Sequence, residues 1–310
     1  MEKIKLCIAG VGGVGGLLAA FAAEDETIEL SLIAHGKRAE HLRTEGITLH
    51  SDIFGTHGGI PAHVEEFGSD LPIQKYVLVC VKNYSLREIA EQIRGCVGKD
   101  TVLVPVMNGI EAADVLRELF PGNIVLDAVI YTISEALPDY SVTQVGKHSY
   151  MIVGARDTAQ AGYAQALQQI LSHAGYDCRY TEDAVGEMWQ KFMQNCAYNT
   201  VTARYLINSG VIQNSPELGN DIRGLLEETY RTALACGVKL PEDAVEQKYR
   251  HTMFRQDPSA TSSMRRDAEA GRRTELDTFL GALIRRAEAH GVEVPTARRY
   301  YAEMIQRMKV

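Results

Sequence analysis

The stretch Lys5-Leu6-Cys7-Ile8-Ala9-Gly10-Val11-Gly12-Gly13-Val14-Gly15 decides how the first half of this 310-residue chain folds. Residues 5–9 form a short, mostly apolar run that stops at Gly10, which predicts a strand. Residues 14–23 are small and apolar and predict a helix. Between these segments, Gly10, Gly12 and Gly15 have the spacing G-x-G-x-x-G. A strand, a glycine turn and a helix in this order are typical of the first βαβ unit of a Rossmann-type sheet.

This glycine turn is suited to hold the pyrophosphate of a dinucleotide. Glycines let the backbone approach the anion closely, and the start of the next helix offers free N–H groups and the positive end of its dipole. A lone G-x-G-x-x-G is weak evidence because glycine is common in loops, but here it follows a strand and opens a helix. The alternative is a turn with a purely structural role. We expect pyrophosphate contacts from Gly10, Val11, Gly12, Gly13, Val14 and Gly15.

The segment from Ile4 to Ala23 resembles a signal peptide or membrane anchor, because it is almost free of charge and follows Lys3. Its five clustered glycines would break a membrane-spanning helix. No other stretch of the sequence is long and apolar enough to span a membrane. We therefore expect a cytoplasmic protein with no membrane partner.

Apolar runs and helical segments alternate through residues 1–182. The runs at residues 76–81 and 102–106 are continuously apolar, which indicates strands buried on both faces. Further strands are expected at residues 28–34, 124–131 and 177–181, and helices at 37–45, 85–96, 111–119 and 159–174. Residues 142–153, with Gly146-Lys147-His148 in the middle, predict a hairpin at the sheet edge. The alternation predicts an α/β fold, in which a Rossmann-type, mostly parallel sheet carries helices on both faces.

The pattern changes near Asp183. From there to Val310 nearly every segment has helical period, and helices are expected to begin near residues 184, 217, 242, 261, 274 and 296. We therefore expect two domains, a Rossmann-type cofactor domain at residues 1–182 and an all-α domain at residues 183–310. The helical domain is expected to carry the substrate-binding and catalytic residues.

Charge and cysteine content argue against several classes of protein. The 32 Lys and Arg residues against 40 Asp and Glu give a net charge of −8 and a pI near 5.6, which argues against nucleic-acid binding. Arginine pairs near the C-terminus alternate with acids and indicate a solvated helix face. The six cysteines include no C-x-x-C pair, so we expect reduced thiols and no metal site.

The end of the second strand indicates which dinucleotide binds. NAD-selective proteins usually place an Asp or Glu there to accept from the ribose 2′-hydroxyl group. This strand is followed instead by His35-Gly36-Lys37-Arg38, with two cations and no acid. Cations suit a 2′-phosphate, so we expect NADP(H) bound by Lys37 or Arg38, and the sequence does not choose between them. The alternative is that both residues only begin a solvated helix.

Two loops follow buried strands at the edge where open α/β sheets bind ligands. Lys82 follows residues 76–81, and Asn108-Gly109 follows residues 102–107. Their position favours a role in binding cofactor or substrate. The alternatives are a surface lysine and an ordinary turn.

A polar stripe interrupts an otherwise apolar helical segment at residues 187–199. Lys191, Asn195 and Asn199 recur at every fourth position, which predicts that they share one face of an α-helix. Their neighbours include Trp189 and Phe192, so the helix is expected to be largely buried. Buried polar groups need partners, and a substrate would supply them. The alternative is an internal polar network.

Two further motifs are Ser262-Ser263-Met264-Arg265-Arg266-Asp267 and Thr274-Glu275-Leu276-Asp277. Together with the glycine turn, Lys82, Asn108-Gly109, the W-x-K-x-x-x-N-x-x-x-N segment and the ending at residues 289–295, they resemble the ketopantoate reductase (2-dehydropantoate 2-reductase) family of NADPH-dependent enzymes. The resemblance extends over essentially the whole chain. Several motifs in the right order are more specific than any one of them.

The resemblance implies a role for each matching residue. Lys191 matches the family's proton donor, Asn195 and Asn199 its substrate-binding amides, and Ser263 its contact to the substrate carboxylate. Lys82 would lie beside the cofactor, Asn108 where nicotinamide meets substrate, and Glu275 would close on the cofactor ribose.

The chain departs from the family pattern at two positions. His35 stands where members often carry Arg at the end of the second strand. Ser209, before Gly210, stands where members carry a substrate-binding Asn, with Asn208 one position earlier. A hydroxyl offers different donors and acceptors from an amide, which leaves the substrate open.

The expected function is NADPH-dependent reduction of 2-dehydropantoate to pantoate, a step toward pantothenate and coenzyme A. One alternative is a related NAD(P)-dependent reductase or dehydrogenase acting on another 2-oxoacid or hydroxyacid. A non-catalytic nucleotide sensor is disfavoured, because it would not need Lys191 as a proton donor. A small 2-oxoacid is the expected partner, and a homodimer is possible.

Overall fold

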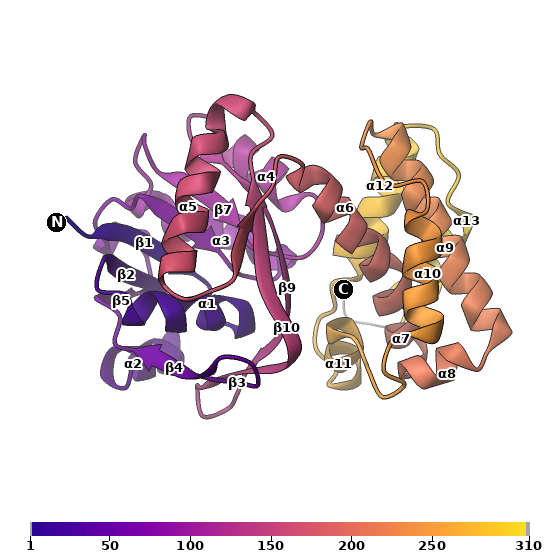
Figure 1. Cartoon of the computed structure of the whole chain (residues 1–310), viewed down its shortest axis with the longest axis horizontal. Coiled ribbons are helices and arrows are strands. Elements are labelled where there is room, and N and C mark those ends of the chain that lie inside the picture. Colours follow the sequence, from indigo (N-terminus) through magenta and orange to yellow (C-terminus); the bar gives the residue numbers. More distant parts are fainter. Residues whose placement is uncertain (1, 308–310) are drawn as a thin grey trace. The chain divides into compact units, whose positions relative to one another are not determined.

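The computed structural model describes residues 2–307 and divides into two compact units (Figure 1). The first unit comprises residues 1–108 and 112–184, and the second comprises residues 109–111 and 185–310. The predicted fold class is confirmed, because the first unit contains a parallel sheet with helices and the second is helical.

The first unit is built on a six-stranded sheet of order β5-β2-β1-β6-β7-β8 in which all pairings are parallel. Its strands are β1 (Ile4–Ala9), β2 (Ile28–Ile33), β5 (His63–Glu65), β6 (Tyr76–Val79), β7 (Val102–Pro105) and β8 (Ile124–Val125). Alternate residues of β1 enter different cores: Leu6 and Ile8 join one cluster, and Cys7 and Ala9 the other. The sheet is therefore buried on both faces, as its apolar runs predict.

Helices contribute to both cores. The helices are α1 (Gly13–Glu24), α2 (Gly36–Thr44), α3 (Leu86–Ile93), α4 (Ala112–Leu119) and α5 (Ala161–His173). Residues of α1, α2 and α5 belong to one cluster, and residues of α3 and α4 belong to the other. Each expected helix of this half is therefore present, within a few residues of its predicted bounds.

A second sheet, of order β11-β10-β3-β4 with β9 paired to β10, was not predicted. Its strands are β3 (Ile47–Ser51), β4 (Gly55–Gly59), β9 (Asp127–Ala136), β10 (Val142–Gly154) and β11 (Cys178–Tyr180). Strand β4 reads Gly-Thr-His-Gly-Gly and has no apolar residue to signal a strand. The single strand expected at residues 124–131 is wrong, because the chain passes from β8 to β9, and so between sheets, at Leu126.

The hairpin expected within residues 142–153 is also wrong. These residues form one strand, β10, which pairs antiparallel with β9. The register shifts between Val145 and Tyr150, so Gly146, with φ +89°, lies in a bulge rather than a turn. The true turn lies between β9 and β10, where Leu137 N donates to Ser141 O at 2.8 Å. A glycine at positive φ suits a bulge as well as a turn, so the pattern was ambiguous.

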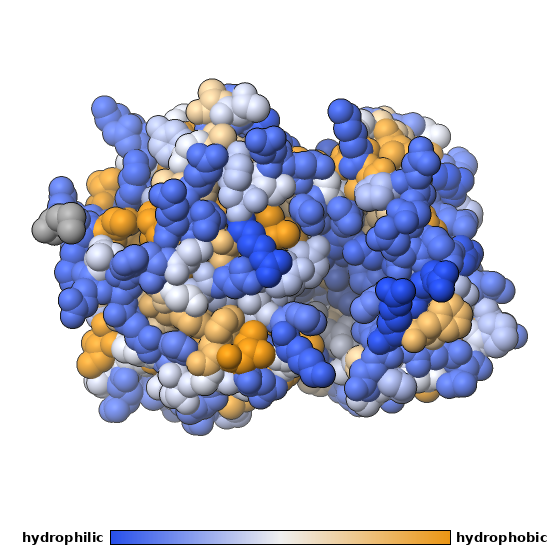
Figure 2. Space-filling model, in the orientation of Figure 1, coloured by the Kyte–Doolittle hydropathy of each residue, from blue (hydrophilic) through white to orange (hydrophobic). Residues whose placement is uncertain are grey.

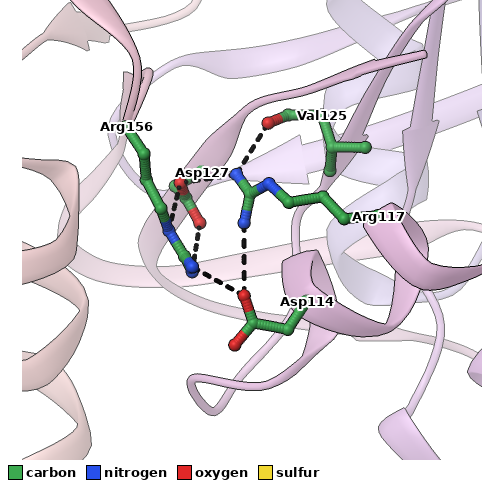
Figure 3. A network of polar contacts seen from close by, with 5 residues as sticks. All are labelled: Asp114, Arg117, Val125, Asp127 and Arg156. Atoms are coloured by element: carbon green, nitrogen blue, oxygen red, sulfur yellow. Dashed lines mark hydrogen bonds and ion pairs between the residues drawn. The ribbon is translucent and has the colours of Figure 1, made fainter. Parts of the chain in front are cut away.

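An ion-pair network holds the corner where the chain enters the second sheet (Figure 3). Asp127, at the start of β9, is fully buried and accepts from Arg117 at 2.9 Å and from Arg156 at 3.0 Å. Arg156 also binds Asp114 of α4 at 2.6 Å, and Arg117 donates to the Val125 carbonyl at 2.7 Å. The buried carboxylate is thus compensated by two guanidinium groups, which tie α4 to both sheets.

In the second unit, the regular secondary structure of residues 185–307 is entirely helical. Its helices are α6 (Ala184–Gln194), α7 (Thr200–Tyr205), α8 (Ser209–Gln213), α9 (Pro216–Ala235), α10 (Ala244–Phe254), α11 (Ser263–Glu269), α12 (Ala282–Ala289) and α13 (Pro295–Ile305). Two π-helical turns, η5 (Asn195–Asn199) and η6 (Asp277–Gly281), precede α7 and α12. Buried Glu228 of α9 accepts from Thr296 N and Ala297 N at 2.7 and 2.8 Å, which caps the start of α13.

Within residues 2–307, no helix combines the length and apolar character needed to cross a membrane. The face drawn in Figure 2 is largely hydrophilic, with its apolar residues in separate small patches. No group of three or more His, Cys, Asp or Glu side chains that could hold a metal ion occurs in the described part of the chain.

Candidate active site

Two glycines of the turn after β1 are required by packing inside the protein. Gly10 has φ +94°, and a Cβ there would lie 2.5 Å from Val81 Cγ1 and 2.9 Å from the Cys80 carbonyl oxygen. A Cβ at Gly15 would overlap the Gly10 carbonyl oxygen. These two positions therefore set the tight turn and the close approach of α1 to β1.

Gly12 differs from both, because a Cβ there would meet nothing within 4 Å. It is the N-cap of α1, it makes no side-chain cap, and the first turn of α1 contains no acid. The N–H groups of this first turn have no acceptor within the helix. Open space, free donors and a positive helix end together fit the pyrophosphate of a dinucleotide.

The structure separates the two cations that follow β2. Lys37 is exposed, whereas Arg38 is half-buried in the first turn of α2. Arg38 Nε and Nη2 are buried and have no hydrogen-bond partner among the described residues. Burial also lowers the pKa of Arg38, an effect that nearby Tyr140 partly opposes. A guanidinium held in place with unused donors is suited to an anion that the protein does not itself supply.

His35, at the position where the family often carries Arg, has polar contacts within the protein. Its ring lies 3.0 Å from Gln92 Oε1 and 3.7 Å from Glu66 Oε2. Both polar partners belong to the protein. Among the three basic side chains that follow β2, Arg38 is the one with buried donors that lack a hydrogen-bond partner in the described residues.

Lys82 and Asn108 lie on neighbouring loops, as predicted. Strands β6 and β7 are adjacent and parallel, so the loops that follow them emerge at one edge of the sheet. Asn83, next to Lys82, donates from Nδ2 to the Asn108 carbonyl at 2.7 Å. This hydrogen bond links the two loops at the edge where β1 ends in the glycine turn.

One residue beside the glycine turn was missed from the sequence. Gly13 packs against Ser134 of β9, since a Cβ at Gly13 would lie 2.5 Å from the Ser134 carbonyl oxygen. Ser134 Oγ is buried and has no hydrogen-bond partner in residues 2–307. Its position depends on the unpredicted second sheet, so no local pattern could have indicated it.

In the second unit, the single α-helix expected to carry Lys191, Asn195 and Asn199 is wrong. Helix α6 ends at Gln194, and Asn195 and Asn199 are the first and last residues of the π-helical turn η5. Four residues of an α-helix advance by about 40° beyond a full turn, so a regular helix would rotate the three positions apart. A π turn contains more residues than a turn of an α-helix, and such turns are frequent at functional sites. Asn195 and Asn199 are both buried.

Lys191 and Glu275 interact electrostatically within this unit. Burial lowers the pKa of the Lys191 ammonium to about 8, and Glu275 acts in the opposite direction. Glu275 is only 2% exposed and lies just before η6, which contacts η5. An amine with a pKa near neutrality can give up a proton and regain it, as a general acid must.

Ser263 belongs to the same unit and lies beside the π turn. It is the first residue of α11, which contacts both η5 and α7. The cap of α11 is Ser262, whose Oγ accepts from Arg265 N at 3.0 Å, so the Ser263 hydroxyl is not used as the cap. Ser209, in contrast, is fully buried and hydrogen-bonded to Tyr198 at 2.7 Å.

The expected site residues therefore form one group in each unit. The cofactor group in the first unit contains Gly10, Val11, Gly12, Gly13, Val14, Gly15, Lys37, Arg38, Lys82 and Asn108. The second group contains Lys191, Asn195, Asn199, Ser263 and Glu275.

Comparisons with known proteins show the family of this chain. Residues 6–158 match the family model described as ketopantoate reductase PanE/ApbA, and residues 183–307 match the model of that family's C-terminal part. The 2-dehydropantoate 2-reductase of Halobacterium salinarum is 28% identical in an alignment 307 positions long that covers 95% of this chain and 96% of that protein.

Solved structures match over the full length. A PanE/ApbA family ketopantoate reductase from Ralstonia eutropha has a TM-score of 0.87 and 27% identity, with 98% of each chain covered. D-mandelate dehydrogenase, solved with NADH and anilino(oxo)acetate, shares the fold, with a TM-score of 0.87, 17% identity and 98% of each chain covered. The chain belongs to the ketopantoate reductase family of oxidoreductases, which is the family that its sequence motifs resemble.

Proposed function

We propose that this protein reduces 2-dehydropantoate to pantoate with NADPH, and that Lys191 is its proton donor. The observation that carries the proposal is the interaction of Lys191 with Glu275, which is only 2% exposed, in a chain of this family; burial there lowers the pKa of Lys191 to about 8. Reduction of a ketone needs a hydride at carbon and a proton at oxygen. NADPH, when bound, supplies the hydride.

The cofactor would be held by the first unit. The glycine turn and the first turn of α1 would bind the pyrophosphate, and Arg38 would bind the 2′-phosphate. The choice of Arg38 over Lys37 rests on its two buried, unused donors among the described residues. Lys82 and Asn108 would lie along the cofactor toward the nicotinamide, and Glu275 would contact its ribose.

Lys191 would stabilise the charge that develops on the carbonyl oxygen and then protonate it. Its ammonium would first donate a hydrogen bond to the carbonyl, which places the proton where negative charge appears. Below a pH of about 8 this amine is mostly protonated, so the acid is ready in each cycle. Solvent would restore the proton after the product leaves.

Asn195, Asn199 and Ser263 would hold the substrate. Amides offer a donor and an acceptor each, which suits a hydroxyl and a carbonyl group. The Ser263 hydroxyl would bind the carboxylate, and Asn108 would contact the substrate beside the nicotinamide.

A second candidate is a related enzyme that acts on another 2-oxoacid or hydroxyacid. Ser209 replaces the amide expected from the family, and the D-mandelate dehydrogenase fold match involves a bulkier aromatic ligand. A panel of 2-oxoacids, followed by the loss of NADPH absorbance, separates the candidates. The highest kcat/KM with 2-dehydropantoate supports the proposal, and a higher value with another 2-oxoacid would replace it.

Three further features belong to the proposal. The protein would act in the cytoplasm, in the synthesis of pantothenate and coenzyme A, and would form a homodimer. Light scattering of the purified chain measures the oligomeric state. Loss of pantothenate-independent growth on deletion of its gene, restored by pantoate, tests the pathway.

A further inference from the structure

A cluster of hydrogen-bonded hydroxyl groups joins the π turn η5 to the loop before α11. Tyr198 of η5 donates to the Ala260 carbonyl at 2.9 Å, and its oxygen lies 2.7 Å from Ser209 Oγ. Ser209 Oγ also lies 3.3 Å from the Ala260 carbonyl oxygen, so either hydroxyl can donate to the other while its partner donates to this carbonyl. Ser209 N also donates to the Ala260 carbonyl, at 3.0 Å.

A second set of hydrogen bonds runs parallel to the first. Thr202 Oγ1 donates to the Tyr198 carbonyl at 2.7 Å and lies 2.7 Å from Ser262 Oγ. Ser262 Oγ in turn accepts from Arg265 N at 3.0 Å, as the cap of α11. We call the side chains of Tyr198, Ser209, Thr202 and Ser262 the hydroxyl clamp.

The hydroxyl clamp is buried and all four hydroxyl groups have partners. Ser209 and Thr202 are fully buried, and Tyr198 and Ser262 are each 4% exposed. Removing one partner from such a group leaves the other without a hydrogen bond away from water, which is costly. The loop at residues 257–262 is held further by Gly210 N, which donates to the Pro258 carbonyl at 2.8 Å.

The segments that the clamp joins carry the expected substrate contacts. Tyr198 lies in η5 between Asn195 and Asn199, and Ser262 directly precedes Ser263. These contacts are separated by more than 60 residues of chain, so no local backbone geometry sets their spacing. We propose that the hydroxyl clamp, and Tyr198 first, positions Ser263 relative to Asn195 and Asn199. This inference rests on the proposed function, which assigns those three residues to the substrate.

The inference also explains the departure at position 209. The Ser209 hydroxyl is used inside the protein, by Tyr198, and its side chain has no exposed surface. Ser209 therefore acts on the substrate through Tyr198 rather than by contact, and is a positioning residue. A larger amide at this position would require Tyr198 to move.

The experiment compares Tyr198→Phe with Tyr300→Phe in the full-length protein. Tyr300 is a matched control, because it is also buried in the second unit but donates to Asp221 of α9 at 2.6 Å. For Tyr198→Phe we expect KM for the 2-oxoacid to rise about threefold to tenfold, because both hydrogen bonds of the Tyr198 hydroxyl are lost. We expect kcat and NADPH affinity to change less than twofold. Tyr300→Phe should lower stability and leave KM unchanged.

A second pair of variants tests the hydrogen bond between Thr202 and Ser262, and keeps the inference testable if Tyr198→Phe does not fold. Thr202→Val removes the hydroxyl that meets Ser262, while Thr202→Ser keeps it. KM should rise in Thr202→Val and return toward normal in Thr202→Ser. The double variant Tyr198→Phe with Ser209→Ala should have a KM close to that of Tyr198→Phe alone, because the phenylalanine already removes the hydrogen bond between Tyr198 and Ser209.

The outcomes separate this inference from the proposed function. A wild-type protein that reduces no 2-oxoacid overturns the proposed function and this inference with it. A wild-type protein that reduces one, together with unchanged KM in Tyr198→Phe and Thr202→Val, overturns the inference alone. Equal rises in KM for Tyr198→Phe and Tyr300→Phe would also overturn it, because the effect would then be general loosening of the unit.

Discussion

The glycine turn of the first unit and the π turn of the second, which we propose bind cofactor and substrate, are built in opposite ways. The glycine turn works through missing side chains: Gly10 and Gly15 let backbone pack on backbone, and Gly12 leaves open space at the start of a helix. The π turn works through side chains that are present and buried, such as Asn195 and Asn199, in a unit that also buries Glu275. The first region is contiguous in the chain, and the second combines three distant segments.

The two regions are therefore expected to be sensitive to different kinds of substitution. An added atom at the glycine turn either breaks packing or blocks an approaching ligand, depending on the position. At the π turn, the sensitive quantity is the balance between burial and partners for polar groups. Substitutions and a pH profile can test this contrast between the two regions.

The largest effect is expected at Lys191. Lys191→Ala should lower kcat by about 10²–10⁴-fold, the usual contribution of a positioned acid, and leave NADPH affinity nearly unchanged. Steady-state kinetics and a direct NADPH titration on the same variant measure both. Lys248→Ala is the matched control, since Lys248 in α10 also has a pKa lowered by burial. Near-normal kcat in Lys191→Ala would remove this residue as proton donor.

The next effect concerns the choice of cofactor. Arg38→Ala should weaken NADPH binding by about 1–3 kcal/mol, or roughly 5–150-fold, because charge-assisted hydrogen bonds to a phosphate are lost. NADH binding should stay the same. Exposed Lys37→Ala should have a much smaller effect on either cofactor. Fluorescence titration of both variants with each cofactor measures these affinities. If Arg38→Ala lost as much affinity for NADH as for NADPH, a contact to the 2′-phosphate would be contradicted.

The pH dependence of reduction should follow the Lys191 amine. Since burial lowers its pKa to about 8, kcat/KM should be level below that pH. Above it the acid loses its proton, and kcat/KM should fall about tenfold per pH unit. The profile should be measured with saturating NADPH to keep cofactor binding out of the slope. A profile that stays level to pH 10 would mean that the titrating acid is another group.

Two neighbouring glycines should respond differently to the same added methyl group. Gly12→Ala meets no protein atom within 4 Å, so it should keep its melting temperature and lose NADPH affinity on the order of tenfold. Gly15→Ala would overlap the Gly10 carbonyl and should destabilise the fold by about 1–3 kcal/mol. Thermal unfolding and NADPH titration of the pair test this. If Gly12→Ala lowered the melting temperature and kept its NADPH affinity, Gly12 would be required for packing rather than for binding the cofactor.

The smallest effect should be a gain in stability. Below pH 8 Lys191 is charged in both the folded and the unfolded protein, so the cost of its burial is fully present. Lys191→Met should therefore raise the melting temperature by a few degrees at pH 7. Between pH 8 and its ordinary pKa of 10.5, the folded lysine is neutral while the unfolded one still binds a proton, so wild-type stability rises. The difference in melting temperature between Lys191→Met and the wild-type protein should therefore be smaller at pH 10 than at pH 7. A difference that stays constant with pH would contradict the lowered pKa of Lys191.

Local sequence pattern determined much of this protein. The glycine spacing, the continuous apolar runs of β6 and β7 and the helical period after residue 183 each depend on residues close in the chain. Backbone conformation and burial of one segment leave such periodic signals. The motif order was also enough to identify the family, which the family models confirm.

Tertiary structure alone decided the rest, because it depends on contacts between distant segments. The second sheet has strands such as β4 with no apolar pattern, and the turn between β9 and β10 could not be told from the bulge at Gly146. From the sequence, Lys37 and Arg38 were equally good candidates for a contact to the 2′-phosphate. Only the burial of their side chains in the structure distinguishes them. The pKa of Lys191 and the hydroxyl clamp have the same origin: both arise from polar groups buried together by folding, which no spacing along the chain records.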